Sequence, residues 1–218
     1  DYPGEDWDAV QPETLGYSSA KLEDLRNYLK DSCSTTSMMI VTGGKVIFSY
    51  GDVAENVKIA SCRKSLISML YGKYVENGTI NLESTLEELG IDDKGGLLPI
   101  ERKATVRNLI TARSGVYHPA SNDGDDQKYA PKRGSVKPGT YHLYNNWDFN
   151  CAGAVFEQLT GKDIYDAFME DIAIPVGMQD YKISALAAMK PSVYCILETE
   201  IRDKNNQVVF VNRVLPRQ

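Results

Sequence analysis

The sequence has no block of lysine or arginine, no apolar run long enough to cross a bilayer, and few histidines. Its 218 residues carry 24 Lys and Arg against 30 Asp and Glu, a formal net charge of -6. Binding to nucleic acid by counterion release needs a basic face, so we expect no nucleic-acid partner. A spanning helix needs about 20 apolar residues, so we expect no membrane span. The only histidines, His118 and His142, lie at no zinc-ligand spacing, and we expect no metal or cofactor.

The four cysteines form no C-x-x-C pair. Cys62 and Cys151 lie in apolar stretches with helical spacing, where a free thiol packs as a small apolar group, so we expect both to be buried. A disulfide between Cys33 and Cys195 stays open, because sequence alone cannot pair them. The chain starts at Asp1 without a methionine or a signal peptide, as in a mature secreted protein or a trimmed chain, so the compartment is left unassigned.

Apolar periodicity and capping residues predict a mixed α/β protein. Several stretches have helical spacing and a polar or glycine boundary. They run from the Ser18 or Ser19 cap to about Lys30, from near Ser61 to the Asn77-Gly78 stop, from Thr105 to Ala112, from Trp147 to Leu159 and from Ile164 to Ile172. Residues 117–139 are rich in Gly, Pro, Asp, Asn and Lys, and they predict a long loop of the kind that is often functional.

Two pairs of apolar runs predict strands. Met38–Val41 and Val46–Tyr50 flank Gly43-Gly44, which is a hairpin signal. Near the end of the chain, Val193–Ile201 and Val208–Val214 flank a polar turn. We therefore expect an antiparallel sheet that contains the first hairpin and has room for the second.

Residues 61–64, Ser-Cys-Arg-Lys, fit the S-x-x-K pattern of a lysine-assisted serine nucleophile. On a helix, Ser61 and Lys64 lie on one face, so the amine can approach the hydroxyl group. Desolvation disfavours a charged amine, and a buried lysine can therefore take the serine proton. A helix that begins at the serine also directs a backbone N–H at a developing oxyanion. Residues 18–21, Ser-Ser-Ala-Lys, fit the same pattern, and a capping serine beside a solvated lysine is the alternative interpretation.

Residues 144–146, Tyr-Asn-Asn, form the only Y-x-N in the chain. The Tyr144 phenol can relay a proton beside a cationic group, and an asparagine amide can hold a substrate carbonyl. The alternative is a polar turn that caps the next helix, with Asn146 as the cap and Trp147 packed inward. Both interpretations can be true together.

Three blocks in order resemble the serine β-lactamase and penicillin-binding protein-like superfamily, most closely its class C β-lactamase, esterase and D-peptidase branch. They lie within residues 38–181 and read IASCRKSLISMLYGKYVENGTINLESTLEELGI, ATVRNLITARSGVYHP and KPGTYHLYNNWDFNCAGAVFEQLTGKDIYDAF. The resemblance implies a single β-lactamase/transpeptidase-like domain over residues 1–218. That α+β domain has an antiparallel sheet flanked by helices and a mostly helical subdomain at residues 61–175. The resemblance also favours a periplasmic or secreted location.

The resemblance assigns roles to four residues of this chain. It implies Ser61 as the acylated nucleophile and Lys64 as the group that activates it. It implies Tyr144 as the general base and acid, and Asn146 as a substrate-orienting residue. The third element of the superfamily, K-[ST]-G or H-x-G on a strand beside the nucleophile, does not follow Tyr144 in this sequence.

Residues 182–218 lie beyond the resemblance, so we expect a fold that is incomplete at the C-terminus and ends in an atypical tail. Three explanations stay open. The tail is a replacement β-hairpin, a product of truncation or an altered reading frame, or part of a sheet that a partner chain completes. The last explanation would give a homo-oligomer through an unfinished sheet edge.

The sequence thus predicts a serine hydrolase that forms an acyl-enzyme on a small-molecule ester or amide, which includes β-lactams and D-peptide-like substrates. In the family, the K-T-G element helps to bind the carboxylate of penicillins, and its absence favours an ester substrate. Two alternatives stay open. One is a binding or scaffold protein of the same fold with impaired catalysis, and the other is an incomplete fragment.

Overall fold

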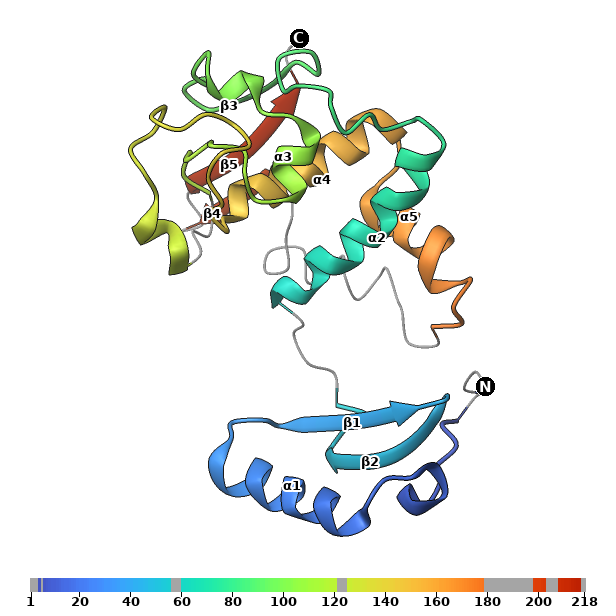
Figure 1. Cartoon of the computed structure of the whole chain (residues 1–218). Coiled ribbons are helices and arrows are strands. Elements are labelled where there is room, and N and C mark those ends of the chain that lie inside the picture. The colour runs from blue at the N-terminus through green and yellow to red at the C-terminus, as the bar shows by residue number, and fades with distance from the viewer. Residues whose placement is uncertain are drawn as a thin grey trace. The chain divides into compact units, whose positions relative to one another are not determined.

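The computed structural model of the chain describes residues 4, 6–55, 60–120, 125–178, 198–202 and 208–216. The chain divides into two compact units, Asp1–Lys58 and Ile59–Gln218 (Figure 1). Helices and antiparallel strands occur in the order that periodicity predicted, so the mixed helix-and-sheet class is confirmed. Among the described residues, no helix combines the length and the hydropathy that a membrane span needs.

The first unit contains helix α1 (Ser19–Ser32) and the hairpin of β1 (Ser37–Thr42) and β2 (Lys45–Gly51). The turn between the strands is Gly43-Gly44, where both φ angles are positive, as a tight hairpin requires. Ser18 caps α1, because its hydroxyl accepts a hydrogen bond from the Lys21 N–H at 3.4 Å. In the S-x-x-K pattern of residues 18–21, the serine is therefore a helix cap.

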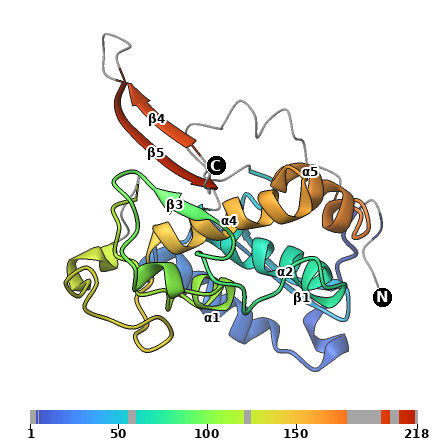
Figure 2. The ribbon, with the colours of Figure 1, turned by 90° about the horizontal axis from the view of Figure 1, so that it is seen from above.

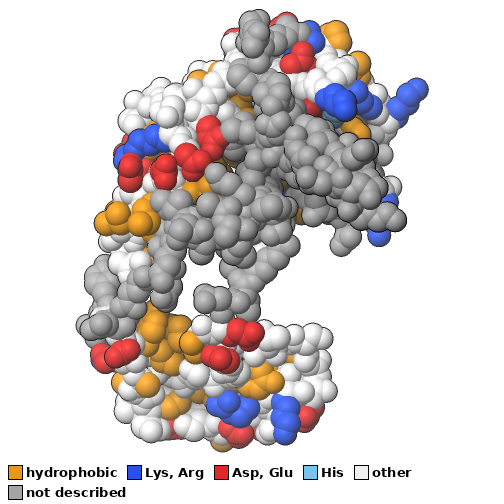
Figure 3. Space-filling view, turned by 180° about the vertical axis from the view of Figure 1, so that it is seen from behind, with side chains coloured by type: hydrophobic (Ala, Val, Ile, Leu, Met, Phe, Trp, Pro, Cys, Tyr) orange, Lys and Arg blue, Asp and Glu red, His pale blue; other side chains and the backbone are white. Residues whose placement is uncertain are grey.

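Hydrophobic side chains form patches on the surface of the first unit, between acidic and basic ones (Figure 3). The large hydrophobic residues exposed in this unit are Trp7, Leu15, Tyr17, Tyr28, Met38, Met39, Val41 and Val53. Three of them belong to β1, so the described residues of this unit leave part of that strand uncovered.

The second unit is built around helix α4 (Asn146–Thr160), which contacts both α2 (Arg63–Glu76) and α3 (Val106–Ile110) (Figures 1 and 2). Helix α5 (Ile164–Phe168) follows and continues into a π-helical turn, Met169–Ala173. The side chains at the centre of the hydrophobic core are less than 2% exposed and include Leu70, Ile80, Leu86, Leu109, Val116, Trp147, Val155 and Phe156. The predicted helices are thus confirmed, with a change to π geometry after Phe168.

A second, three-stranded sheet belongs to this unit, in the order β3 (Ile91–Asp93), β5 (Val208–Pro216), β4 (Glu198–Arg202). Both pairs are antiparallel. The strands predicted in the tail therefore overlap β4 and β5, while residues 193–197 lie outside the described residues. Short 3-10 helices complete the described elements: Pro12–Leu15, Ala60–Cys62, Glu101–Lys103 and Asp125–Tyr129.

Local sequence signals explain most of the helix ends. Asn77 ends α2, followed by Gly78 at φ +78°, so a helix stop accounts for the Asn-Gly-Thr sequence at this point. Thr105 and Asn108 form a reciprocal capping box at the start of α3. Gly161, in the left-handed conformation, ends α4.

Two sequence predictions at helix starts were wrong. The cap of α4 is Asn145 instead of Asn146: the Asn145 side chain accepts from the Asp148 N–H at 2.8 Å. Cys62 was expected to be buried but is exposed, because it lies in the 3-10 turn before α2 begins. Cys151 is buried as predicted, and Cys33 is a free thiol. Cys195 lies outside the described residues.

Candidate active site

Ser61 lies in the 3-10 turn Ala60–Cys62, directly before α2. The residue before it, Ala60, has φ 44°. This left-handed conformation is rare for a residue with a Cβ, and such strain is common where a functional side chain must be presented. The Arg63 guanidinium donates to the Ala60 carbonyl oxygen at 2.9 Å and so stabilises the turn. The backbone thus holds Ser61 at the start of the helix, exposed to solvent.

The Lys64 amine is the centre of the candidate site. Lys64 is only 7% exposed, and its Nζ lies 3.4 Å from Ser61 Oγ, 2.5 Å from Tyr144 Oη and 2.5 Å from Asn146 Oδ1. The amine also lies over the rings of Tyr144 and Phe149, 4.1 and 4.7 Å from their centroids. Oxygen acceptors and aromatic faces thereby compensate for the loss of water around a buried cation. The four side chains that the sequence singled out lie together.

The electrostatics of Tyr144 favour the phenolate. Burial raises the pKa of the Tyr144 phenol, but hydrogen bonds from Lys64 and Ser61 lower it, as do the charges of Lys64 and Arg63. The net effect is a pKa below the ordinary value of tyrosine. Tyr144 is therefore a better proton acceptor at moderate pH than an ordinary tyrosine.

A cavity of about 290 Å³ opens beside these groups. Its lining combines serines of α2 and of the turn before it with apolar side chains of α2, α3 and α4. The lining residues are Ser61, Lys64, Ser65, Ile67, Ser68, Ile110, Tyr144, Phe149 and Ala152. Lys64 is the only cation among them, and it already serves three oxygen atoms, so this cavity suits a small neutral group.

The structure adds a pair of buried polar residues that sequence reasoning missed. Ser114 Oγ donates to Asp148 Oδ1 at 2.5 Å, and both side chains lie in the core, 1% and 0% exposed. The available signal was an aspartate in the first turn of the apolar helix α4. Its partner lies 34 positions earlier in the chain, where no pattern pointed to it.

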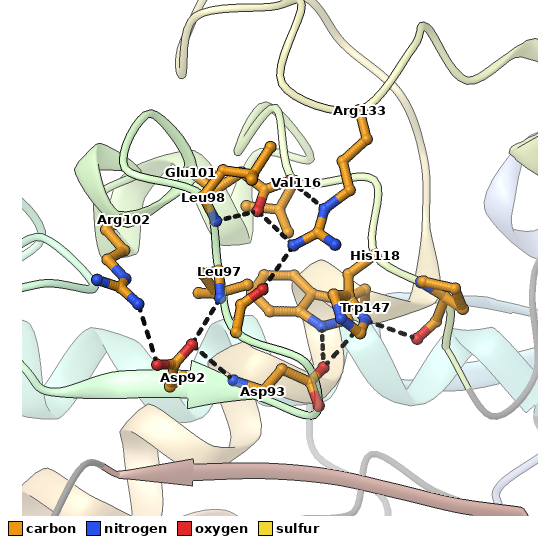
Figure 4. A network of polar contacts seen from close by, with 12 residues as sticks. Asp92, Asp93, Leu97, Leu98, Glu101, Arg102, Val116, His118, Arg133 and Trp147 are labelled. Carbon is orange, nitrogen blue, oxygen red and sulfur yellow. Dashed lines mark hydrogen bonds and ion pairs between the residues drawn. The ribbon is translucent and has the colours of Figure 1, made fainter.

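A polar network at the end of β3 holds the indole of Trp147 (Figure 4). Its indole Nε1 donates to Asp93 Oδ2 at 2.7 Å, and His118 Nδ1 lies 3.4 Å from the same oxygen. His118 Nε2 lies 2.9 Å from the Lys94 carbonyl oxygen. Because a carbonyl oxygen can only accept a hydrogen bond, His118 Nε2 is the donor. His118 therefore ties the loop after α3 to the β3 turn and takes no part in the Lys64 cluster.

The same network anchors the long loop predicted at residues 117–139 (Figure 4). The Arg133 guanidinium donates to both carboxylate oxygens of Glu101 at 2.8 Å and to the Gly96 carbonyl oxygen at 2.8 Å. The Glu101 side chain is 0% exposed, and that of Arg133 is 34% exposed. A two-point pair on a buried carboxylate fixes the loop firmly.

Arg133→Ala is expected to lower the free energy of unfolding by about 3 kcal/mol, because it leaves the Glu101 carboxylate buried without its cation. Chemical denaturation followed by fluorescence measures the change. Arg107→Ala is the matched control, since Arg107 pairs with Glu83 on the surface, where the two side chains are 53% and 62% exposed, and such a pair contributes about 0–1 kcal/mol. Equal losses in the two variants would show that burial of Glu101 does not matter.

Among the described residues, no group of three or more His, Cys, Asp or Glu side chains is placed to hold a metal ion.

This chain is similar in sequence and in structure to known proteins. The Beta-lactamase family model matches residues 23–196. A curated relative, monacolin J acid methylbutanoyltransferase of Aspergillus terreus, is 29% identical over 153 aligned residues, which cover 56% of this chain and 37% of that protein. The octameric penicillin-binding protein homologue of Pyrococcus abyssi is 19% identical with a TM-score of 0.57 and covers 92% of this chain and 51% of its own. EstCE1, a hydrolase with promiscuous acyltransferase activity, is 18% identical with a TM-score of 0.53, over 74% of this chain and 52% of its own. The chain therefore spans about a third to a half of these proteins.

Proposed function

We propose, from the premise that this chain belongs to the Beta-lactamase family, that it forms an acyl-enzyme on Ser61. Family membership also confirms the β-lactamase/transpeptidase-like fold and the superfamily that the sequence resembles. The contact of one buried amine, Lys64 Nζ, with Ser61, Tyr144 and Asn146 is the observation that carries the proposal.

The proposed reaction is a two-step acyl transfer. Tyr144 accepts the Ser61 hydroxyl proton, and Ser61 Oγ attacks the substrate carbonyl carbon. The backbone N–H of Ser61, at the start of α2, donates to the oxyanion. Tyr144 then returns the proton to the leaving oxygen. In the second step water attacks the acyl carbon, Tyr144 takes the proton from the water and returns it to Ser61 Oγ, and the acid is released.

Lys64 and Asn146 have supporting roles in this proposal. The positive charge of Lys64 favours the phenolate of Tyr144, in line with the lowered pKa of that phenol. Asn146 orients the substrate through its amide, and its Oδ1 also holds the amine of Lys64 in place. No step needs a metal or a cofactor.

For the substrate, we propose an ester with a small neutral acyl group. Ile67, Ile110 and Phe149 make much of the cavity wall apolar, and among the lining residues no second cation is present to pair with a carboxylate. The absence of a K-[ST]-G sequence after Tyr144 agrees with this choice. Self-association through an unfinished sheet edge remains a prediction, and the octameric assembly of one relative supports it.

Transfer to an alcohol is the second candidate, because the curated relative named above is a methylbutanoyltransferase. The first step is the same, and only the acceptor in the second step differs. Product analysis with and without an added alcohol separates the two: transfer yields a new ester, whereas hydrolysis yields only the free acid.

Labelling with a fluorophosphonate, followed by peptide mass spectrometry, tests the acyl-enzyme. We expect a single adduct on Ser61 that disappears in Ser61→Ala. Ser18→Ala is the matched control, because Ser18 has the same S-x-x-K context but serves as a helix cap. That control should keep full labelling, although the lost cap lowers stability by about 1 kcal/mol.

The remaining outcomes assign the rival functions. A chain that melts cooperatively but gives no adduct would contradict the proposal and favour a binding or scaffold protein. Retained binding of an unreactive ester analogue, measured by calorimetry, would then support that alternative. A chain that does not melt cooperatively would favour an incomplete fragment.

A further inference from the structure

The segment that carries Tyr144 and Asn146 is linked to the end of α3 on both sides. Before Tyr144, the Leu143 N–H donates to the Ala112 carbonyl oxygen at 3.0 Å. After Asn146, the Asp148 carboxylate accepts from the Ser114 hydroxyl at 2.5 Å. The first link is a backbone hydrogen bond, and the second depends on a single titratable side chain.

Each polar atom around the Asp148 carboxylate has a defined direction. Ser114 Oγ accepts from the Val116 N–H at 2.9 Å, so its own proton points to Asp148 Oδ1. The Ser114 N–H faces Asp148 Oδ2 at 3.4 Å. Both Ser114 groups and the Asn145 side chain donate to the carboxylate, and no ion pair to Asp148 occurs in the part of the chain that the structure describes.

We propose that Asp148 is a positioning residue for the acyl transfer: its ionised carboxylate, held by Ser114, fixes the first turn of α4 and so keeps Tyr144 and Asn146 in place on Lys64. The inference rests on the proposed function of Ser61. Asp148 itself is 0% exposed and touches none of the reacting groups, so it acts through the helix start alone.

Protonation of Asp148 would weaken this link. A neutral carboxyl group carries its own O–H, which would face groups that are already donors. Burial raises the pKa of the Asp148 carboxyl to about 7, although hydrogen bonds from Ser114 and Asn145 lower it. The change of state therefore falls near neutral pH, and the helix start loses its anchor on the acid side.

The titratable neighbours do not change this expectation. The charge of Asp148 acts on two titratable groups, Tyr117 and Cys151. Burial raises the pKa of Tyr117 to about 12 and the pKa of Cys151 above its ordinary value. Both thus stay neutral where Asp148 titrates. Tyr141 acts on Tyr117, and the Asp93 carboxylate acts on Cys151, from the loop and from β3.

Stability and acylation are expected to respond to pH in opposite directions. Because the folded-state pKa of Asp148 is raised above the unfolded value of about 4, the folded state holds an extra proton between about pH 4 and pH 7. The contribution to folding stability is therefore lost as pH rises through this window. Acylation needs the carboxylate and rises through the same window. A residue with a purely structural role would move both quantities together.

The test compares the rate of Ser61 labelling by a fluorophosphonate in the wild type and in Asp148→Asn, from about pH 5 to about pH 9. Other groups titrate in both proteins, so the ratio of the two rates isolates Asp148. We expect the ratio to reach about 10²-fold on the alkaline side, the cost of a misplaced catalytic group. On the acid side of the Asp148 pKa the ratio should approach one.

Ser114→Ala provides a second measurement. It removes the hydroxyl donor that holds the Asp148 carboxylate and lowers its pKa, so the labelling rate should fall on the alkaline side and the remaining acid limb should move to higher pH. Asp171→Asn is the matched control: that carboxylate is also buried, with 8% exposure, and accepts from Tyr74 Oη at 2.6 Å. Its labelling profile should equal that of the wild type.

Two results would overturn the inference: a rate ratio that does not change with pH, or a labelling profile of Ser114→Ala that equals that of the wild type. Either can occur while the wild type is labelled normally, and Ser61 would then keep its proposed role. A wild type that takes no label contradicts the proposed function itself.

Discussion

Lys64→Met is expected to slow the acylation of Ser61 by about 10²–10⁴-fold while the protein remains folded. The substitution removes the donor shared by Ser61, Tyr144 and Asn146. It also removes the hydrogen bond and the charge that lower the pKa of Tyr144, so the phenol should titrate at higher pH. Methionine fills a similar apolar volume beside the rings of Tyr144 and Phe149, and it places no charge in a site that is mostly shielded from water.

Stopped-time labelling with a fluorophosphonate measures this rate, and a thermal melt checks the fold. Lys73→Met is the matched control, because Lys73 lies on the same helix, has a side chain that is 58% exposed, and pairs with Asp171. The control should label like the wild type. Equal labelling rates in Lys64→Met and the wild type would remove Lys64 from the mechanism.

The elements of the fold follow largely from local sequence signals. Gly43-Gly44 supplies the positive φ angles of a hairpin, and Asn77-Gly78 ends α2 because an α-helix cannot continue through that conformation. These features depend on neighbouring residues, so periodicity and turn chemistry predict them. The exact helix start is less well determined: Asn145 and Asn146 are adjacent, either can cap α4 on sequence grounds, and the structure has Asn145 as the cap where the alternative interpretation expected Asn146.

The candidate site depends on contacts between distant parts of the chain. The Lys64 amine meets Tyr144 across 80 positions and Asn146 across 82, which no local pattern predicts. The resemblance of the ordered blocks implies that these residues act together. Ser114 and Asp148 lie in the same blocks, but a buried serine and a helix-start aspartate each have ordinary structural explanations, so their contact became evident only in three dimensions.

Tyr144→Phe is expected to lower the rate of Ser61 labelling by about 10²–10⁴-fold and to change its pH dependence. The phenyl ring keeps the contact with Lys64 and the packing against Phe149, whose ring centroid lies 5.6 Å away, so only the hydroxyl group is lost. In the wild type, the rate should rise with pH as the phenolate forms at a pKa below the ordinary value. Without the phenol, that rise should disappear.

Tyr74→Phe is the matched control, because Tyr74 is 6% exposed and loses one hydrogen bond to Asp171. Its stability should fall by about 1 kcal/mol, and its labelling profile should not change.

The double variant Tyr144→Phe/Asp148→Asn then separates two ways in which Asp148 can act on the site. If Asp148 acts by placing the phenol, Asp148→Asn should have little further effect once the hydroxyl group is absent, because coupled residues are not additive. Independent, multiplying losses would instead mean that Asp148 supports the site through Asn146 or through the helix as a whole.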